Sequence, residues 1–353
     1  MSKVLIMVNH SMTVINFRLE LVERLLKDGH DVVISSPYDE RIEELKQMGC
    51  EYYPVELSRH GMNPIKELKL LKNYKKQLKE IKPDIVFTYT IKPNIYGAIA
   101  CRKYKVPCVA NVTGLGTAVE NGGLSQKITV ALYKFAFKKI HKVFFQNEKN
   151  MQFFKDRKIA NDSCELIPGS GVNLERFVPA PYPTDEALNL VFVGRIMKDK
   201  GVYELAQAAK DMPNVHVTVV GDTYENSENP FIGIPNVECV GRQKDVIPFV
   251  VKAHAAVLPS YHEGMANVLL EASACARPVL ATNINGCKET FDEGITGFGF
   301  EPKNVESLKQ AISKLAILSN GERREMGIKA REKMEKEFSR EIVIEKYCAL
   351  LNK

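Results

Sequence analysis

The chain has 353 residues, a length typical of two domains, and its 45% hydrophobic and 26% charged residues exclude a largely disordered protein. No apolar run reaches the roughly 18 residues of a membrane-spanning helix. We expect a cytoplasmic protein, because the N-terminus leads into a short apolar run instead of a secretory signal.

The net charge of +6 is unevenly spread along the chain. Residues 1–175 hold 27 Lys and Arg against 19 Asp and Glu, which predicts an anionic partner for the first half. The eight cysteines include no C-x-x-C pair, so the sequence favours reduced thiols and no metal site.

The first half alternates between short apolar runs and helix-length segments. Residues 4–8 are continuously apolar, as expected of a parallel strand covered on both faces. A helix is predicted over residues 16–27, because Asp28-Gly29 ends the pattern. Further strands are predicted at residues 30–35, 84–89, 107–112, 142–146 and 164–167. The alternation predicts right-handed crossovers and a mostly parallel sheet.

The pattern restarts after a stretch rich in Pro and Gly at residues 168–183, which we interpret as a linker. Strands are predicted at 188–193, 216–220, 237–240, 255–258 and 278–282, and a last helix at 340–352. We therefore predict an α/β chain of two Rossmann-like, doubly wound domains facing across a cleft. The first comprises residues 1–172 and 338–353, and the second residues 173–337. Ligands bind at the carboxyl ends of the strands in such folds.

Two motifs of the second half carry chemistry. The strand at 188–193 is followed by Gly194-Arg195 and by Lys200-Gly201, and a guanidinium with an ammonium can neutralise a diphosphate without a metal. A solvated basic loop would give the same residues.

The second motif follows the strand at 255–258. Glu263-Gly264 is predicted to lie at the strand end, and a helix begins near Ala266 and carries Glu271 among apolar residues. Such a carboxylate can accept hydrogen bonds from both hydroxyls of a ribose. The backbone N–H groups of Met265 and Ala266 are expected to face a phosphate. Ordinary surface acids at a helix start are the alternative interpretation.

Together these motifs resemble the GT-B glycosyltransferases of family 4. The resemblance rests on Glu263-x7-Glu271 preceded by Gly194-Arg195-x4-Lys200-Gly201, and it covers essentially the whole chain. Segments at 4–10, 16–18, 111–116 and 170–173 fall where the bacterial polysaccharide branch has similar ones. Within that branch the chain resembles enzymes that extend undecaprenyl-diphosphate-linked sugars, including the α-1,3-N-acetylgalactosaminyltransferase type.

The resemblance implies a retaining, metal-independent transferase without a cofactor, which uses a UDP-sugar donor and a lipid-diphosphate-linked saccharide acceptor. It implies that Arg195 and Lys200 hold the donor diphosphate, that Glu271 binds the ribose and that Glu263 contacts the donor sugar. The catalytic residues would be Glu263, Arg195 and Lys200. Further donor contacts are expected from Gly264, Met265, Ala266, Asn267, Arg242 and Asn173.

The acceptor side departs from the family pattern. The family's common histidine after the strand at 107–112 is replaced by Thr113-Gly114, and the loop after the first strand, which contains His10, lacks the family's paired glycines. His10 could substitute near the sugar, although a loop histidine is more often structural. By position and charge, the acceptor-side candidates are His10, Asn16, Arg18, Arg59, His60, Thr113 and Gly114.

Two basic segments of the first half point to the anionic inner face of the cell membrane, where the chain would be peripherally associated. Residues 65–82 carry seven lysines, and we expect Ile65, Leu68, Leu71, Leu78 and Ile81 to face the core. The lysines then form either an ordinary solvated helix face or a face attracted to anionic lipid. Residues 127–142 are apolar around much of the circumference and are either well buried or partly inserted in the interface.

Other function classes fit less well. A GT-B sugar-nucleotide 2-epimerase or hydrolase would share the fold but meets no lipid. A Rossmann-type NAD-dependent oxidoreductase would need G-x-G-x-x-G after a strand, which the chain lacks. A nucleic-acid-binding protein would fit the charge but not the mixed acidic and basic constellation of the second half. A metal-dependent transferase of the other major fold would show Asp-x-Asp, which does not occur in the sequence.

Overall fold

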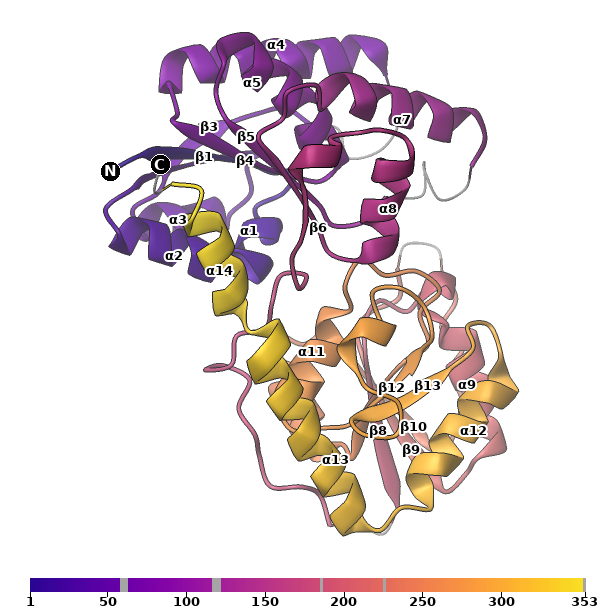
Figure 1. Cartoon of the computed structure of the whole chain (residues 1–353). Coiled ribbons are helices and arrows are strands. Elements are labelled where there is room, and N and C mark those ends of the chain that lie inside the picture. The colour runs from indigo at the N-terminus through magenta and orange to yellow at the C-terminus, as the bar shows by residue number, and fades with distance from the viewer. Residues whose placement is uncertain (58–62, 116–121, 185–186, 225–226, 352–353) are drawn as a thin grey trace. The chain divides into compact units, whose positions relative to one another are not determined.

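The computed structural model describes residues 1–57, 63–115, 122–184, 187–224 and 227–351 (Figure 1). It divides the chain into two compact units: Met1–Ser170 with Val343–Lys353 (unit 1), and Gly171–Ile342 (unit 2). The expected domain ends at 172 and 337 lie within a few residues of these boundaries.

Unit 1 contains a seven-stranded parallel sheet in the order β3-β2-β1-β4-β5-β6-β7. The chain winds outward from β1 in both directions, as predicted for a doubly wound domain. The short edge strand β3 was not predicted. The strands are β1 (Lys3–Met7), β2 (Asp31–Ser36), β3 (Glu51–Pro54), β4 (Ile85–Tyr89), β5 (Cys108–Val112), β6 (Lys142–Phe145) and β7 (Cys164–Leu166).

Helices cover both faces of this sheet (Figure 1). In β1, Leu5 and Met7 pack toward α4, α5, α7 and α8, while Val4 and Ile6 pack toward α1, α2 and α14. This alternation is the expected consequence of the two-residue period of a strand. The helices are α1 (Met12–Phe17), α2 (Leu19–Lys27), α3 (Ile42–Gln47), α4 (Pro64–Ile81), η1 (Pro93–Gly97), α5 (Ala98–Tyr104), α7 (Gly123–Ala136), α8 (Glu148–Asp156), η2 (Asn161–Ser163) and α14 (Arg340–Cys348), whose residues from Val343 onward belong to unit 1.

Two helix predictions for unit 1 were wrong in detail. The predicted helix at 16–27 is two helices, α1 and α2, because the backbone of Arg18 leaves the helical region at φ −141° and ψ 9°. On α4 the predicted apolar stripe does not all face the core, since Ile65 and Leu68 are 79% and 67% exposed. The buried positions of α4 are instead Glu67, Leu70, Tyr74, Gln77 and Leu78.

Unit 2 contains a six-stranded parallel sheet in the order β10-β9-β8-β11-β12-β13. The last strand, β13, was not predicted. The strands are β8 (Leu188–Val193), β9 (Val215–Val220), β10 (Val237–Gly241), β11 (Ala255–Leu258), β12 (Val279–Thr282) and β13 (Gly297–Phe300). The helices are η3 (Lys198–Lys200), α9 (Val202–Asp211), α10 (Ile247–Lys252), α11 (Asn267–Ala274), η4 (Lys288–Thr290), α12 (Val305–Ala316), α13 (Asn320–Lys333) and η5 (Met334–Phe338).

Each unit has its own hydrophobic core. The core of unit 2 is one cluster that includes Phe192, Leu269 and Leu280, and unit 1 has one cluster on each face of its sheet. None of the helices in the described part of the chain has both the length and the apolar character needed to cross a membrane.

Candidate functional site

The order of strands in unit 2 reverses between β8 and β11, so the loops that follow these neighbouring strands share one edge of the sheet. The loop after β8 carries Lys200, and the loop after β11 carries Glu263. Lys200 Nζ lies 2.5 Å from Glu263 Oε1, and Ser260 Oγ donates a hydrogen bond of 2.8 Å to the same oxygen. The fold therefore brings two of the three expected catalytic side chains into direct contact, and it adds Ser260, which the sequence interpretation missed.

Gly201 makes this close approach of the two loops possible. Its φ is +67°, and a Cβ at this position would lie 2.0 Å from the carbonyl oxygen of Pro259. The same two loops are joined by a hydrogen bond of 2.8 Å from the N–H of Tyr261 to the carbonyl oxygen of Asp199. Only glycine satisfies both the positive φ and the missing space, so the Lys200-Gly201 pair of the sequence motif has a structural reason.

Arg195 is exposed on the loop that follows β8. Its guanidinium carbon lies 4.6 Å from the centre of the Tyr224 ring, a cation–π contact that orients the side chain. The N–H of Tyr224 in turn donates to the carbonyl oxygen of Ile196 at 3.1 Å. Arg195 is therefore held at the surface of unit 2 as a charged fork that a phosphate can reach.

Glu271 lies half-buried on α11, in the apolar environment that the sequence predicted. Burial raises the pKa of Glu271 to about 7, while the positive charges of Arg340 and Arg176 act in the opposite direction. A carboxyl group balanced in this way near neutral pH gains from hydrogen-bond donors that favour its ionised form. Neither arginine was predicted to lie near it.

The segment that contains Arg176 is held to the beginning of α14 by the backbone. The N–H of Arg340 donates to Val172 O at 3.0 Å, and the Arg340 guanidinium donates to Gly171 O at 3.2 Å. Asn173, an expected donor contact, accepts a hydrogen bond of 2.9 Å from the N–H of Arg176 through its Oδ1. This oxygen therefore shapes the turn that presents Arg176.

One expected contact of the α11 start was wrong. The N–H of Ala266 donates to the carbonyl oxygen of Gly286 at 2.8 Å, so this amide is already paired within the protein. Ala266 and Met265 are also buried, at 2% and 7% exposure. The reason is close backbone packing, because a Cβ on Gly286 would lie 2.7 Å from Glu263 O. The loop around Gly264 is thus fixed by backbone contact.

Two further expected donor contacts lie in different environments. Asn267 begins α11, and its buried Oδ1 has no hydrogen-bond partner among the residues that the structure describes. Arg242 is exposed after β10, where its backbone N–H donates to Asp222 Oδ1 at 3.0 Å. The Asn267 side-chain oxygen can therefore still accept a hydrogen bond, and the charged Arg242 side chain is accessible to solvent.

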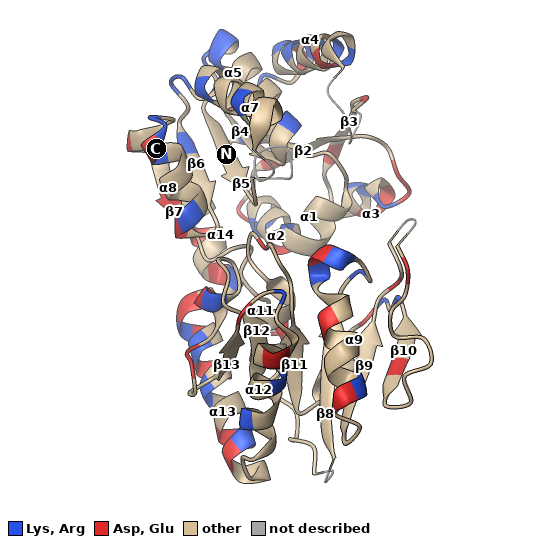
Figure 2. Ribbon diagram, turned by 90° about the vertical axis from the view of Figure 1, so that its right-hand side faces the viewer, with Lys and Arg blue, Asp and Glu red and all other residues tan. Residues whose placement is uncertain are grey.

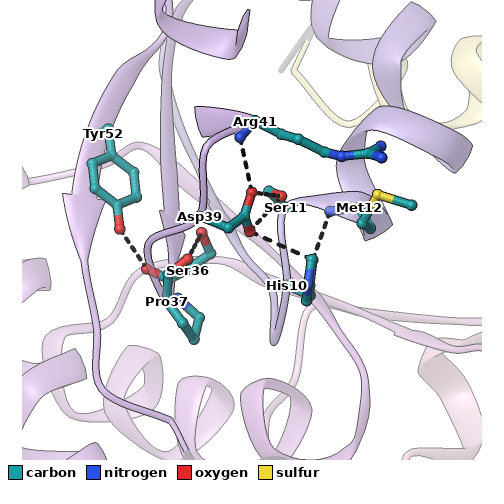
Figure 3. Close-up of polar contacts among 8 residues, drawn as sticks. All are labelled: His10, Ser11, Met12, Ser36, Pro37, Asp39, Arg41 and Tyr52. Atoms are coloured by element: carbon teal, nitrogen blue, oxygen red, sulfur yellow. Dashed lines mark hydrogen bonds and ion pairs between the residues drawn. The ribbon is translucent and has the colours of Figure 1, made fainter. Parts of the chain in front are cut away.

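In unit 1 the loop after β1 carries His10 (Figure 3). The backbone N–H of Met12 donates to His10 Nδ1 at 3.0 Å, which leaves Nε2 to carry the proton of the neutral ring. Asp39 Oδ2 lies 3.5 Å from the same Nδ1. Asp39 also accepts a bifurcated hydrogen bond from the buried Ser11 hydroxyl, which lies 2.6 Å from each carboxylate oxygen, and a hydrogen bond of 3.1 Å from the N–H of Arg41. Asp39, which was not predicted, thus ties the loops after β1 and β2 together, and the N–H of Met12 holds the His10 ring.

Arg18, an expected acceptor contact, is buried at 2% exposure. Its guanidinium carbon lies 5.0 Å from the centre of the Tyr89 ring and 5.9 Å from that of the Tyr347 ring. An N–H of the guanidinium donates a hydrogen bond of 2.6 Å to Phe17 O. This environment differs from the surface position that the sequence interpretation assumed. Arg18 packs α1, β4 and α14 together, and we correct its expected role to a structural one.

The remaining acceptor-side candidates are distributed over several elements. Asn16 is exposed on α1, while Thr113 and Gly114 are half-buried directly after β5. Arg59 and His60 lie outside the described residues. The loops after β1 and β5 both begin at the carboxyl ends of the strands in the unit 1 sheet, which is where doubly wound domains bind ligands.

Comparison with protein families identifies both halves of the chain. The family described as "Glycosyl transferase 4-like" matches residues 3–147, and the family described as "Glycosyl transferases group 1" matches residues 187–317. The two matches fall within unit 1 and unit 2.

Similar proteins cover most of the chain. The Campylobacter jejuni N,N'-diacetylbacillosaminyl-diphospho-undecaprenol alpha-1,3-N-acetylgalactosaminyltransferase is 28% identical over 86% of both chains. The Escherichia coli UDP-Gal:alpha-D-GlcNAc-diphosphoundecaprenol alpha-1,3-galactosyltransferase is 30% identical over 70% of both. The solved structure of Anabaena Alr3699/HepE superposes over both whole chains with a TM-score of 0.81 at 17% identity. The chain therefore has the GT-B fold and belongs to the family 4 glycosyltransferases.

Proposed function

We propose that this glycosyltransferase is retaining and metal-independent and moves a hexose or N-acetylhexosamine from a UDP-sugar to an undecaprenyl-diphosphate-linked saccharide in bacterial glycan assembly. N-acetylgalactosamine is the preferred donor sugar. The observation that carries the proposal is the contact between Lys200 and Glu263 at the reversal point of the unit 2 sheet, with Glu271 eight residues further on. The Campylobacter and Escherichia relatives act on diphospho-undecaprenol-linked sugars, and the Escherichia relative uses UDP-Gal.

The geometry suggests how the residues divide the work. Lys200 and Arg195 provide two positive charges for the donor diphosphate and for the UDP that leaves, without any metal. When the diphosphate takes the Lys200 ammonium, Glu263 is released to accept hydrogen bonds from sugar hydroxyls. Glu271 accepts hydrogen bonds from the ribose. In a retaining front-face reaction the departing phosphate oxygen helps to take the acceptor proton, so the protein acts by position and charge.

The test is a transfer assay with the purified chain in EDTA. The donors are UDP-N-acetylgalactosamine, UDP-galactose and UDP-N-acetylglucosamine, and the acceptor is a synthetic prenyl-diphosphate-linked N-acetylhexosamine. We expect transfer with retention of the anomeric configuration, read by NMR of the product, and loss of turnover in Glu263→Gln. Glu238→Gln, which changes an exposed glutamate of β10, is the matched control. Epimerised or hydrolysed UDP-sugar without a transfer product would favour the epimerase or hydrolase alternative instead, and dependence on added Mg²⁺ would refute metal independence.

We also propose that unit 1 associates with the anionic inner face of the cell membrane through α7. One side of α7 packs into the core with Thr129, Tyr133 and Ala136, and residues 123–139 contain no Asp or Glu. The opposite side exposes large apolar side chains between exposed lysines. These are Leu124 (73% exposed), Ile128 (42%) and Phe135 (50%), with Lys127 and Lys134, and the exposed Lys138 follows the helix.

The neighbouring helices extend this basic surface. The helices α4, α5 and α7 lie on the same side of the unit 1 sheet (Figure 1), and Lys and Arg are frequent on all three (Figure 2). The Arg102 guanidinium on α5 lies 4.5 Å from the centre of the Phe135 ring. Apolar side chains between cations are typical of helices that lie in the interface of an anionic membrane.

Vesicle co-sedimentation tests this association. We expect binding to vesicles that contain phosphatidylglycerol and little binding to pure phosphatidylcholine. Each of Lys127→Ala and Lys134→Ala should weaken binding about fivefold, since a basic residue contributes about 1 kcal/mol near an anionic leaflet. Ile128→Ser should also weaken it, whereas Ile317→Ser, which changes an 83% exposed residue of unit 2, should not. Equal effects of the two isoleucine changes would refute the assignment of the surface to α7.

A further inference from the structure

A groove of unit 1 lies at the carboxyl ends of β2 and β3 and is bordered by α4. It encloses about 940 Å³, and among the described residues its lining includes no expected donor or acceptor contact, although three of its lysines belong to the basic segment at 65–82. We call it the α4 groove. Its lining includes Tyr38, Tyr53, Glu56 and Asn73, and four lysines, which are Lys66, Lys69, Lys76 and Lys92.

The groove contains an ion pair that is almost completely buried. Lys92 Nζ lies 2.6 Å from Glu67 Oε1, and the two side chains are 15% and 10% exposed. Glu67 occupies the core-facing side of α4 together with Leu70 and Tyr74, where an apolar residue would be expected. Burying two charges costs desolvation energy, so the pair is poorly explained as a stabilising device alone.

The turn that carries Lys92 is strained. Thr90, the first residue after β4, has φ +72°, a value that β-branched residues rarely adopt. Its hydroxyl oxygen is buried and has no hydrogen-bond partner in the described part of the chain. Such strain persists where the surrounding structure holds a residue in place for a function. The strain at Thr90 lowers stability, and it positions Lys92 at the carboxyl ends of the strands.

The charge of the groove identifies the class of ligand. Four lysines face two glutamates, Glu56 and Glu67, and Lys69 Nζ lies 2.5 Å from Glu56 Oε2 at the exposed rim. The lysines of the lining outnumber its glutamates, although Lys76 Nζ also lies 3.8 Å from Glu80 Oε1 outside the lining. The remaining positive balance favours an anionic ligand such as a diphosphate diester. From this balance we propose that the α4 groove binds the diphosphate of the lipid-linked acceptor. This inference rests on the proposed function.

Two observations favour the acceptor over other sources of phosphate. The proposed function already assigns the donor diphosphate to Arg195 and Lys200 in unit 2. On α4, Ile65 and Leu68 are exposed beside the groove lysines Lys66 and Lys69, so apolar surface lies next to the anion site, as a diphosphate with a prenyl chain requires. Because Arg18 is buried, the groove lysines take the role of binding the acceptor that the sequence interpretation had assigned to Arg18.

Calorimetry on the full chain tests the proposal, with farnesyl diphosphate as the probe and UDP as the comparison ligand. Lys92→Met should weaken farnesyl diphosphate binding about tenfold or more, because it removes a charge-assisted contact. Glu67→Gln should strengthen it, because it removes the anion that competes for Lys92. Lys79→Met, an exposed α4 lysine that does not line the groove, is the matched control. UDP binding should stay unchanged in all three variants.

Opposite shifts in Lys92→Met and Glu67→Gln separate a binding role from a structural one, since thermal unfolding would report both changes as losses of the same ion pair. Equal affinities in Lys92→Met and Lys79→Met would overturn the proposal, and so would a parallel fall in UDP binding. If Lys92→Met instead lowers binding to phosphatidylglycerol vesicles as strongly as binding to farnesyl diphosphate, the groove recognises phospholipid and the proposal fails. Binding needs no turnover, so a negative transfer assay with the expected shifts would refute the proposed function and leave the groove as a prenyl-diphosphate site that is not an acceptor site for transfer.

Discussion

Replacing Glu271 with Gln tests whether a carboxylate is kept at α11 for nucleotide binding at the expense of stability. Burial raises the pKa of Glu271 to about 7 in the folded chain, against about 4.3 for an exposed glutamate. Between these values the folded state holds a proton that the unfolded state has released. Stability therefore falls as the pH rises through this window, and the loss is complete above pH 7.

The size of the effect follows from the two pKa values. At about 1.36 kcal/mol per pKa unit, the raised pKa of Glu271 lowers the free energy of unfolding by about 2 kcal/mol at pH 5.5 and by about 4 kcal/mol at pH 8. The Glu271→Gln variant has no charge to bury. We expect its stability relative to the wild type to increase by about 2 kcal/mol between these two pH values, measured by urea unfolding.

Nucleotide binding should change in the opposite direction. If the ribose hydroxyls donate to the ionised form alone, a pKa of about 7 makes UDP binding about tenfold weaker at pH 6 than at pH 8. The UDP phosphate also titrates near pH 6, so the ratio of wild-type to Glu271→Gln affinity isolates the Glu271 contribution. Calorimetry at both pH values measures this ratio. An unchanged ratio, or a variant no more stable than the wild type at pH 8, would refute the reasoning.

Three further substitutions test the other assignments. Gly201→Ala places a Cβ 2.0 Å from Pro259 O at a positive φ, so we expect a loss of more than about 1 kcal/mol in urea unfolding and lower turnover; wild-type values would contradict the close approach of the loops. Arg195→Ala should lower kcat/KM about a hundredfold, equivalent to about 3 kcal/mol, in the transfer assay, and a wild-type value would remove Arg195 from the site. Arg18→Lys should lower the thermal unfolding temperature and leave the acceptor KM unchanged below it, because the guanidinium packs on Tyr89 and Tyr347; a raised KM would restore its expected binding role.

The order of elements was predictable because continuous apolar runs mark strands that are buried on both faces. The two strands that were missed lack this signal. Glu51–Pro54 lies at the sheet edge with both end residues exposed, and Gly297–Phe300 alternates Gly with Phe. A glycine-rich strand has low intrinsic preference for the extended state and is recognised only from its neighbours.

The unit 2 site could be predicted in part because its residues follow strand ends within short loops. Sequence spacing places Lys200 and Glu263 on adjacent loops, and the structure puts them in contact. Arg340 could not be predicted, since it lies 69 positions after Glu271 and reaches its surroundings through the start of α14. The hydrogen bond that the Ala266 N–H makes could not be predicted either, because its acceptor, the carbonyl oxygen of Gly286, belongs to the loop after β12.

Each unit contains a largely buried ion pair between a lysine and a glutamate, and only the pair of unit 2 belongs to the sequence motif. Lys200 contacts Glu263 in unit 2, and Lys92 contacts Glu67 in unit 1, at 2.5 and 2.6 Å, and all four side chains are at most 21% exposed. A buried lysine without a partner would lose its proton or its place in the fold. A carboxylate partner fixes the ammonium in position, and we propose that a phosphate replaces this partner when the ligand binds. Exchange of one anion for another costs less than desolvation of a free ammonium, and both of our binding proposals use this exchange to receive a diphosphate.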